Sequence, residues 1–472
     1  MEIVSRNATI EVAFHPHAMK PIGVGLDFGT TNSSIALADA DGVVQLASFP
    51  WAEGFTEAFR SILYLERNRV AGRTTTSSWT GPQAIEKYLA AEEKGRLIQS
   101  LKSFLTSRTL QSTEVFGRRH TLESLISVML RDIRGVAERQ FGKPLTDVVV
   151  GRPVRFVGSD STEDDDFACS RLEAALHLAG FARVSFEFEP VGAAYHYEST
   201  LDHDELILIG DFGGGTSDFS LLRVGPSFRQ GGRQRGRTAQ DLLANEGIGM
   251  AGDSFDAKII RHLVSPALGD GTSLRSMDKV LPVPTWVYRK LERWHHLSFL
   301  KAKDVIDMLQ SVKASAFEPE RIEALLHLIQ DDLGYHLHRS VQHLKCALSE
   351  SDAAVFKFDD ADAYIEAAVE RREFESWIAE ELEAIEGCVR RCVDQAGVDP
   401  REVDRVFLTG GSSFVPAVRR IFERRFGRDR IRSGNEFTSV ARGLALRALA
   451  TSGRLDKLKH VPRPLEKSRI EE

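Results

Sequence analysis

Two Asp-Phe-Gly triplets, each preceded by apolar residues, constrain the fold of this chain more than any other feature. Asp27-Phe28-Gly29 begins the first loop, and Asp211-Phe212-Gly213 begins the second loop 184 positions later. Small residues continue both loops, and each loop is flanked by segments with the apolar pattern of β-strands. A strand–loop–strand unit repeated at so long an interval predicts two related lobes and not a short-period solenoid.

The rest of the chain alternates predicted strands and helices, as an α/β layered fold requires. Apolar residues have helical spacing over 122–141, and a strand at 147–150 follows. A helix is predicted over 172–180, and we expect Asp164–Asp166 to lie in a loop that caps it. The predicted domains are an N-terminal extension at 1–20, lobe I with the first loop at 21–204, lobe II with the second loop at 205–450, a helical subdomain within it at about 256–348, and a charged tail at 451–472.

Charge and hydropathy exclude several classes of protein. The 472 residues include 61 Lys and Arg against 68 Asp and Glu, a net charge of −7, which argues against nucleic acid or an anionic membrane as the main partner. No signal peptide or membrane span is predicted, so we expect a cytoplasmic location. The basic run Arg229–Arg237 is interpreted as a solvated hairpin extension, with nucleic-acid contact as the alternative. Cys388 and Cys392 share a helix face, where a structural role is favoured over half a metal site.

The chemistry of the two loops indicates phosphate binding. Glycine-rich turns present backbone N–H groups without side-chain obstruction, and Gly29-Thr30-Thr31 and Gly213-Gly214-Gly215-Thr216 both have this form. Neither loop has the Gly-Lys-Ser/Thr ending of a P-loop. A third turn, Gly410-Gly411-Ser412, follows a strand predicted at 403–408. Asp27 and Asp211 are the predicted Mg²⁺ ligands, although each could instead cap only its own turn.

These motifs resemble the ATPase domain of the DnaK-type, seventy-kilodalton heat-shock chaperones, within the superfamily that also contains actin and sugar kinases. The resemblance covers roughly residues 21–450. It rests on stretches that occur in the same order as in the family: Leu26–Asn32, Arg96–Lys102, Glu189–Ala194, Asp211–Asp218, Gly410–Pro416 and Val440–Ala445. It implies an actin-like ATPase fold of two duplicated lobes, each with a central mixed sheet flanked by helices.

The resemblance also implies ATP or ADP with Mg²⁺ and a role for each matching residue. Lys102 would offset phosphoryl charge, although a lone lysine on a helix is otherwise typical of a solvated surface. Glu189 would orient a metal-bound water, and Asp218 would help orient the attacking water. Thr216, the fourth implied catalytic residue, would hydrogen-bond the phosphates with Thr30 and Thr31. The implied nucleotide-binding residues are Gly29, Thr30, Thr31, Asn32, Gly213, Gly214, Gly215, Thr216, Lys345, Ser349, Gly410, Gly411, Ser412 and Phe414.

Two departures from the family pattern affect the expected adenine site. The Glu-x-x-Lys-Arg helix of the family is Gln342-His343-Leu344-Lys345-Cys346 here, and Phe414 replaces an arginine. Both guanidinium groups that would enclose the base are therefore missing, while Phe414 could stack on it. We expect weaker ATP binding or looser base selectivity than in the chaperones.

The chain ends soon after the last ATPase helix and is similar to truncated, YegD-like bacterial members. We therefore expect a nucleotide-driven conformational switch without a peptide-binding domain, acting on a protein client or co-chaperone and served by a nucleotide-exchange partner. One alternative is a nucleotide-gated binding module with little hydrolysis. Another is a small-metabolite kinase, which is disfavoured because the Gly-Gly-Gly-Thr-x-Asp loop matches the chaperones more closely.

Overall fold

The computed structural model describes residues 21–51, 54–70, 73–91, 95–198, 201–227, 242–293, 300–360, 363–433 and 439–451. The predicted N-terminal extension, the tail beyond residue 451 and the basic run 229–237 lie outside these ranges. Within them, none of the helices combines the length and the hydrophobicity needed to cross a bilayer.

The first loop lies at the end of a mixed sheet, which we call the β1 sheet. Its strands are ordered β13-β12-β1-β2-β3, and β6 also pairs with β2. β1 runs antiparallel to β2 and parallel to β12, and Val148–Val150 are buried, as expected for a strand covered on both faces. The strands are β1 (Gly23–Phe28), β2 (Asn32–Ala38), β3 (Val44–Leu46), β6 (Phe59–Arg60), β12 (Asp147–Arg152) and β13 (Arg183–Phe188).

The second loop lies at the equivalent place in a second sheet, the β14 sheet. Its order, β22-β21-β14-β15-β16, repeats the first order when β14 is matched to β1. β14 is likewise antiparallel to the strand after its loop and parallel to β21. The strands are β14 (Glu205–Phe212), β15 (Ser217–Val224), β16 (Leu242–Ile248), β21 (Arg405–Thr409) and β22 (Ile431–Ser433). The predicted α/β class and the duplicated mixed sheets are therefore confirmed.

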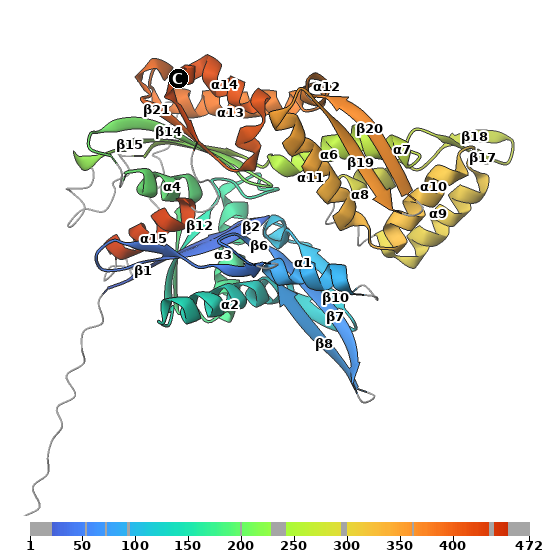
Figure 1. Ribbon diagram of the computed structural model, residues 1–472, viewed down its shortest axis with the longest axis horizontal. Coiled ribbons are helices and arrows are strands. Elements are labelled where there is room, and N and C mark those ends of the chain that lie inside the picture. The colour runs from blue at the N-terminus through green and yellow to red at the C-terminus, as the bar shows by residue number, and fades with distance from the viewer. Residues whose placement is uncertain are drawn as a thin grey trace, which may run out of the picture.

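Two helices connect the halves of the molecule (Figure 1). α4 (Glu189–Glu198) continues from the β1 sheet but packs on the β14 sheet, whereas α15 (Ser439–Thr451) packs on the β1 sheet, and the two helices contact each other. A Cβ on Gly25 would lie 2.4 Å from the carbonyl oxygen of Ala441 and 2.3 Å from the nitrogen of Ala445. Glycine in β1 therefore allows α15 to lie directly on the strand.

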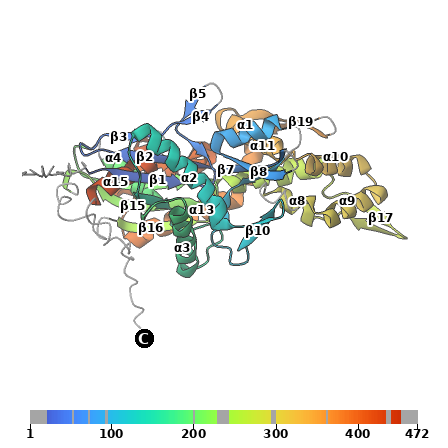
Figure 2. The same cartoon turned by 90° about the horizontal axis from the view of Figure 1, so that it is seen from below.

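Helices also cover the outer faces of the sheets, as Figures 1 and 2 show. α2 (Leu122–Phe141) and α3 (Thr162–Leu178) flank the β1 sheet, and α13 (Ala379–Ala396) and α14 (Pro416–Phe426) flank the β14 sheet. The predicted start of the second helix was wrong. Asp164 and Asp165 belong to the first turn of α3, where acidic side chains complement the helix dipole, and Ser161 is the residue that accepts the Asp164 N–H.

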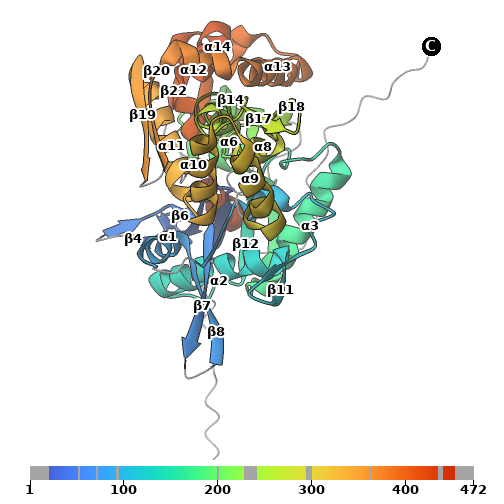
Figure 3. The same cartoon turned by 90° about the vertical axis from the view of Figure 1, so that its right-hand side faces the viewer.

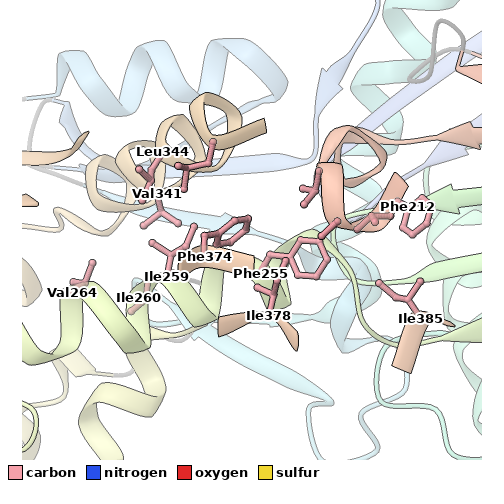
Figure 4. Close-up of a cluster of buried hydrophobic side chains, with 14 of the residues drawn as sticks. Phe212, Phe255, Ile259, Ile260, Val264, Val341, Leu344, Phe374, Ile378 and Ile385 are labelled. Atoms are coloured by element: carbon pink, nitrogen blue, oxygen red, sulfur yellow. The ribbon is translucent and has the colours of Figure 1, made fainter. Parts of the chain in front are cut away.

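A helix-rich extension projects from the β14 sheet along the long axis of the molecule (Figure 1), and its end faces the viewer in Figure 3. Its hydrophobic core is continuous with that of the sheet, because Phe212 of the second loop and Phe255 belong to the same buried cluster as Val341 and Leu344 (Figure 4). Its helices are α6 (Gly252–Ile259), a π-helical turn (Ile260–Val264), α7 (Ser265–Ala267), α8 (Trp286–Leu291), α9 (Lys303–Ser315), α10 (Pro319–Gln330) and α11 (Gly334–Glu350), with hairpins β17 (Ser273–Ser276)–β18 (Lys279–Pro282) and β19 (Ala353–Asp360)–β20 (Ala363–Glu370) and helix α12 (Arg371–Trp377).

A smaller extension of short strands projects from the β1 sheet. It contains β4 (Phe49–Trp51), β5 (Gly54–Thr56), β7 (Ile62–Val70), β8 (Arg73–Thr80), α1 (Gly81–Ala90), β9 (Arg96–Gln99), β10 (Ser112–Val115) and β11 (Arg118–Thr121). Short 3₁₀ helices occur at Leu101–Phe104, Pro400–Glu402, Gly411–Phe414 and Arg428–Arg430.

Candidate nucleotide site

The two predicted phosphate loops face each other between the sheets. A Cβ on Gly214 would lie 2.5 Å from Thr31 Oγ1, and one on Gly215 would lie 3.7 Å from Thr30 Oγ1. Within the second loop, the N–H of Gly213 donates to the carbonyl of Thr216 at 2.9 Å. Glycine at these positions therefore leaves backbone and threonine hydroxyl groups close together, as a polyphosphate site requires.

Lys102 lies in a buried ion pair beside these loops. It belongs to the 3₁₀ helix Leu101–Phe104, is only 7% exposed, and places Nζ 2.6 Å from Glu189 Oε1. Burial alone would lower the pKa of Lys102, but the carboxylates of Glu189 and Asp27 outweigh burial and raise it. Lys102 is therefore buried and is not the solvated surface lysine that its local sequence alone would indicate.

Asp27 and Asp211 occupy matching positions near the ends of β1 and β14. Burial raises the pKa of Asp27 well above its usual range, and Glu189 and Asp211 raise it further. Burial and then Glu189 raise the pKa of Asp211 to about 6, although the Oγ1 of Thr409 donates to Asp211 Oδ1 at 2.6 Å. The loop motifs gave no indication of Thr409, which lies opposite Asp211 in the parallel pairing of β21 with β14.

Asp218 lies opposite Asp211 in the β14–β15 ladder, where the β1 sheet has Ser34 opposite Asp27. It is 1% exposed, and its Oδ1 accepts from the backbone N–H groups of Val154 at 2.6 Å and of Arg155 at 3.3 Å. Burial raises its pKa well above the usual range, and Glu189 and Asp211 add to the effect. The structure therefore brings Asp27, Asp211, Asp218 and Glu189 around one lysine.

No three His, Cys, Asp or Glu side chains within the described residues are arranged as a cage for a metal ion. Cys388 and Cys392 lie in the hydrophobic core, and burial raises the pKa of both thiols to about 12. The two cysteines pack as apolar core residues.

Residues predicted for the adenosine site converge on the start of α6. A Cβ on Gly252 would lie 2.9 Å from Ser412 Oγ and 3.5 Å from Lys345 Nζ. Lys345 Nζ also lies 2.6 Å from Oδ1 of the fully buried Asp256. His338 faces the same carboxylate, and burial lowers the pKa of His338 to about 4. Asp256 is therefore the main anionic neighbour that holds Lys345 beside Gly252.

The other residues predicted to bind the nucleotide lie in the third turn, in α11 and in the first loop. Gly410 has a φ of 84°, and a Cβ there would lie 2.0 Å from the carbonyl oxygen of Phe212, so glycine allows the third turn to pack against the second loop. Gly411 and Ser412 begin the 3₁₀ helix that ends at Phe414, whose side chain is 52% exposed. The Oγ of Ser349 donates to its own helix at Lys345. In the first loop, Gly29 accepts from Ser61 Oγ, and Asn32 Oδ1 accepts from Arg60.

A cavity of about 470 Å³ opens beside Thr30 and Thr31 and reaches α1 on one side and α11 on the other. Its lining includes Arg60, Asp253 and Gln342, and does not include Lys345 or Phe414. Asp253 was missed by the sequence reasoning, although an acid directly after glycine at a helix start is a recognisable signal. Its N–H donates to the carbonyl of Gly214 at 2.8 Å, and burial followed by Asp256 raises its pKa to about 6.

Duplicated sheets of the same strand order, with a glycine-rich loop at equivalent positions facing one another, define an actin-like ATPase fold. The family model described as "Hsp70 protein" matches residues 23–270 and 328–461. The chain therefore belongs to the Hsp70 family. Membership implies ATP binding and chaperone-like activity.

Proposed function

We propose that this chain binds Mg·ATP between its two sheets, hydrolyses it to ADP and phosphate, and uses the cycle as a conformational switch. The observation that carries the proposal is the buried cluster of Asp27, Asp211, Asp218 and Glu189 around Lys102, beside two facing glycine-threonine loops. Such an arrangement is typical of a site that handles both phosphate oxygens and a hard cation.

The donor set fits Mg²⁺. Burial raises the pKa values of Asp27, Asp211 and Asp218, and the Glu189 carboxylate adds to the effect, so a cation bound among them would be favoured. Mg²⁺ takes one or two protein carboxylates and completes its coordination with water and phosphate oxygens, so a full protein cage is not needed. Asp27 and Asp211 would hold the ion and Glu189 would orient one of its waters. When bound, the ion would neutralise phosphate charge.

The protein side chains would supply positioning and charge in the hydrolytic step. Thr30, Thr31 and Thr216, with the loop N–H groups, would hydrogen-bond the phosphates. Lys102 would offset the charge on the transferred phosphoryl group. Asp218 would orient the attacking water. The oxygen of this water would bond to the γ-phosphorus while the bond between that phosphorus and the ADP oxygen breaks, and the Asp218 carboxylate would accept the proton that the water loses.

The two crossing helices support the switch. Ala193 and Ala194 of α4 are fully buried in one cluster with Val440 and Leu444 of α15. Small side chains at this crossing allow a change of angle without opening large gaps, and each helix packs on the sheet of the opposite half. Loss of the γ-phosphate contacts would therefore alter the angle between the halves.

Steady-state phosphate release from Mg·ATP tests the proposal. Lys102→Ala should lower the rate by about a hundredfold, whereas the exposed Lys303→Ala should leave it unchanged. Because loss of one partner from a buried ion pair costs about 3–5 kcal/mol, thermal melts must show that Lys102→Ala is folded, and Lys102→Arg should retain the charge if it is not. Equal release by wild type and a folded Lys102→Ala would refute hydrolysis.

A nucleotide-gated binding module with little hydrolysis is the second candidate function. The observation favouring it is the 2.6 Å pairing of Lys102 with Glu189, which holds the proposed catalytic cation on a protein carboxylate. Under this alternative, ATP would still raise the melting temperature by ligand linkage, while phosphate release would stay at background in every variant.

A further inference from the structure

The β17–β18 hairpin lies in a part of the chain that the family match does not cover. The Hsp70 match stops at residue 270 and resumes at 328, so this hairpin, α8 and α9 fall in the gap. The hairpin forms the far end of the helix-rich extension in both Figure 1 and Figure 2. Its surface is therefore remote from the candidate nucleotide site and lies outside the residues that the family model matches.

One face of this hairpin carries exposed apolar side chains. In the ladder, Ser273 pairs with Pro282 and Arg275 pairs with Val280, so all four side chains lie on the same face. Phe317 lies opposite Ser273, because the N–H of Phe317 donates to the carbonyl of Ser273 at 3.0 Å. The Phe317 side chain therefore joins this face. Val280 is 63% exposed and Phe317 52% exposed.

The turn of the hairpin contains Met277, whose exposure and backbone conformation do not stabilise the fold. Met277 is 95% exposed and has a φ of 53°, in the left-handed region that tight hairpin turns normally fill with Gly, Asn or Asp. Exposure loses the burial energy of the side chain, and the backbone conformation is unfavourable for it. A binding role would account for a methionine at this position.

Arg275 gives this surface a positive charge. Its guanidinium lies 5.8 Å from the ring centre of Phe317, and no carboxylate among the described residues forms an ion pair with it. The nearby Glu318 is paired with Arg321 at 2.9 Å. We define the hairpin patch as Met277, Val280, Pro282 and Phe317 around this arginine.

We propose that the hairpin patch binds an extended segment of a partner protein in which an Asp or Glu lies next to large apolar side chains. The carboxylate would pair with Arg275, and the apolar neighbours would cover Val280, Met277 and Phe317. Charge complementarity selects this partner over a basic one. Binding at the hairpin patch would not require nucleotide hydrolysis.

Selection of a random decapeptide library displayed on phage, using the full-length chain as bait, tests this inference. Wild type should enrich peptides with Asp or Glu beside Phe, Leu, Ile or Met. Arg275→Glu should lose these peptides by about tenfold, the value of one charge-assisted pair, and should select lysine or arginine in their place. Arg289→Glu, at an exposed arginine outside the patch, is the matched control and should select as wild type does.

Two results would overturn the inference. One is the same selected sequences on wild type and Arg275→Glu. The other is a dimer in sedimentation that Val280→Asp dissociates, since a second copy would then be the occupant. Phosphate release by Arg275→Glu should equal that of wild type, so failure of peptide binding and failure of ATP hydrolysis are recorded separately.

Discussion

Asp218 on β15 accepts a 2.6 Å hydrogen bond from the backbone N–H of Val154, which follows β12 of the opposite sheet. The acid proposed to orient the attacking water therefore also connects the two halves of the molecule. A Cβ on Gly247 would lie 2.7 Å from the same carboxylate oxygen, so the neighbouring strand leaves room for it only as glycine. The proposed catalytic step and the arrangement of the halves would both depend on this one side chain.

The two roles of Asp218 can be separated by two substitutions. Asp218→Asn keeps an oxygen that accepts from Val154 and Arg155, whereas Asp218→Ala leaves both N–H groups without that acceptor. Alanine should be less stable than asparagine by about 1–3 kcal/mol in the free energy of unfolding, measured by urea denaturation. Both should hydrolyse ATP about a hundredfold more slowly. Equal stability of the two variants would show that the bond between the halves contributes nothing.

The close approach of α15 to β1 predicts a strong effect of a single methyl group. Gly25→Ala would place a carbon within 2.4 Å of the backbone of α15. Because the clash is with backbone atoms, rotation of flexible side chains cannot relieve it. We expect a loss of about 1–3 kcal/mol in unfolding free energy and impaired coupling between nucleotide and shape, seen as a smaller ATP-induced change in protease sensitivity.

Gly387→Ala is the matched control for this substitution. Gly387 lies in α13, and the nearest atom to an added Cβ is the side-chain Nη1 of Arg391 at 3.6 Å. Alanine there should stabilise the protein by up to about 1 kcal/mol. If Gly25→Ala is tolerated as well as this control, the packing of α15 is looser than the structure indicates.

The exposed Phe414 is predicted to stack on the adenine base in place of the two missing guanidinium groups of the family. If its ring stacks on the base, Phe414→Ser should weaken ADP binding by about 0.5–1.5 kcal/mol and should weaken GDP binding equally, because stacking does not distinguish the bases. Competition against a fluorescent nucleotide measures both affinities. Phe55→Ser, at another exposed phenylalanine, should change neither. Unchanged ADP affinity in Phe414→Ser would place the base elsewhere.

The duplicated sheets and their loops could be predicted from the sequence because they depend on local patterns. Apolar runs, glycine turns and the repeated Asp-Phe-Gly indicate strand, loop and strand without knowledge of distant residues. Burial of Lys102 could be assigned only through the family, since its partner Glu189 is 87 positions away. Thr409 and Val154 were not predicted for the same reason, since each is distant in sequence from the aspartate it contacts. Strand pairing brings Thr409 beside Asp211, and the approach of the two sheets brings Val154 beside Asp218.

The β17–β18 hairpin shows a different limit of the sequence. No hairpin was predicted within the helical subdomain at about 256–348. The four-residue strands are too short for a clear alternating pattern, and the turn contains Met277-Asp278 in place of a typical Asn-Gly. Asp253 lies outside both Asp-Phe-Gly loops. The charged groups around it are Asp256 on its own helix and Lys345 and Arg60 from distant segments.

Asp253 predicts a pH dependence of stability. Burial and Asp256 raise its pKa from 3.8 to about 6, so the folded protein holds this proton more tightly than the unfolded chain does. The associated stability is fully present below about pH 4 and is lost as the pH rises to about 6. Asp253→Asn keeps the shape without the charge, so it should match wild type near pH 4. Above pH 6.5 it should be more stable by about 1–3 kcal/mol, measured by urea denaturation without nucleotide. Asp278→Asn removes the charge of an exposed turn residue as the control, and a constant difference between Asp253→Asn and wild type across this range would contradict the raised pKa.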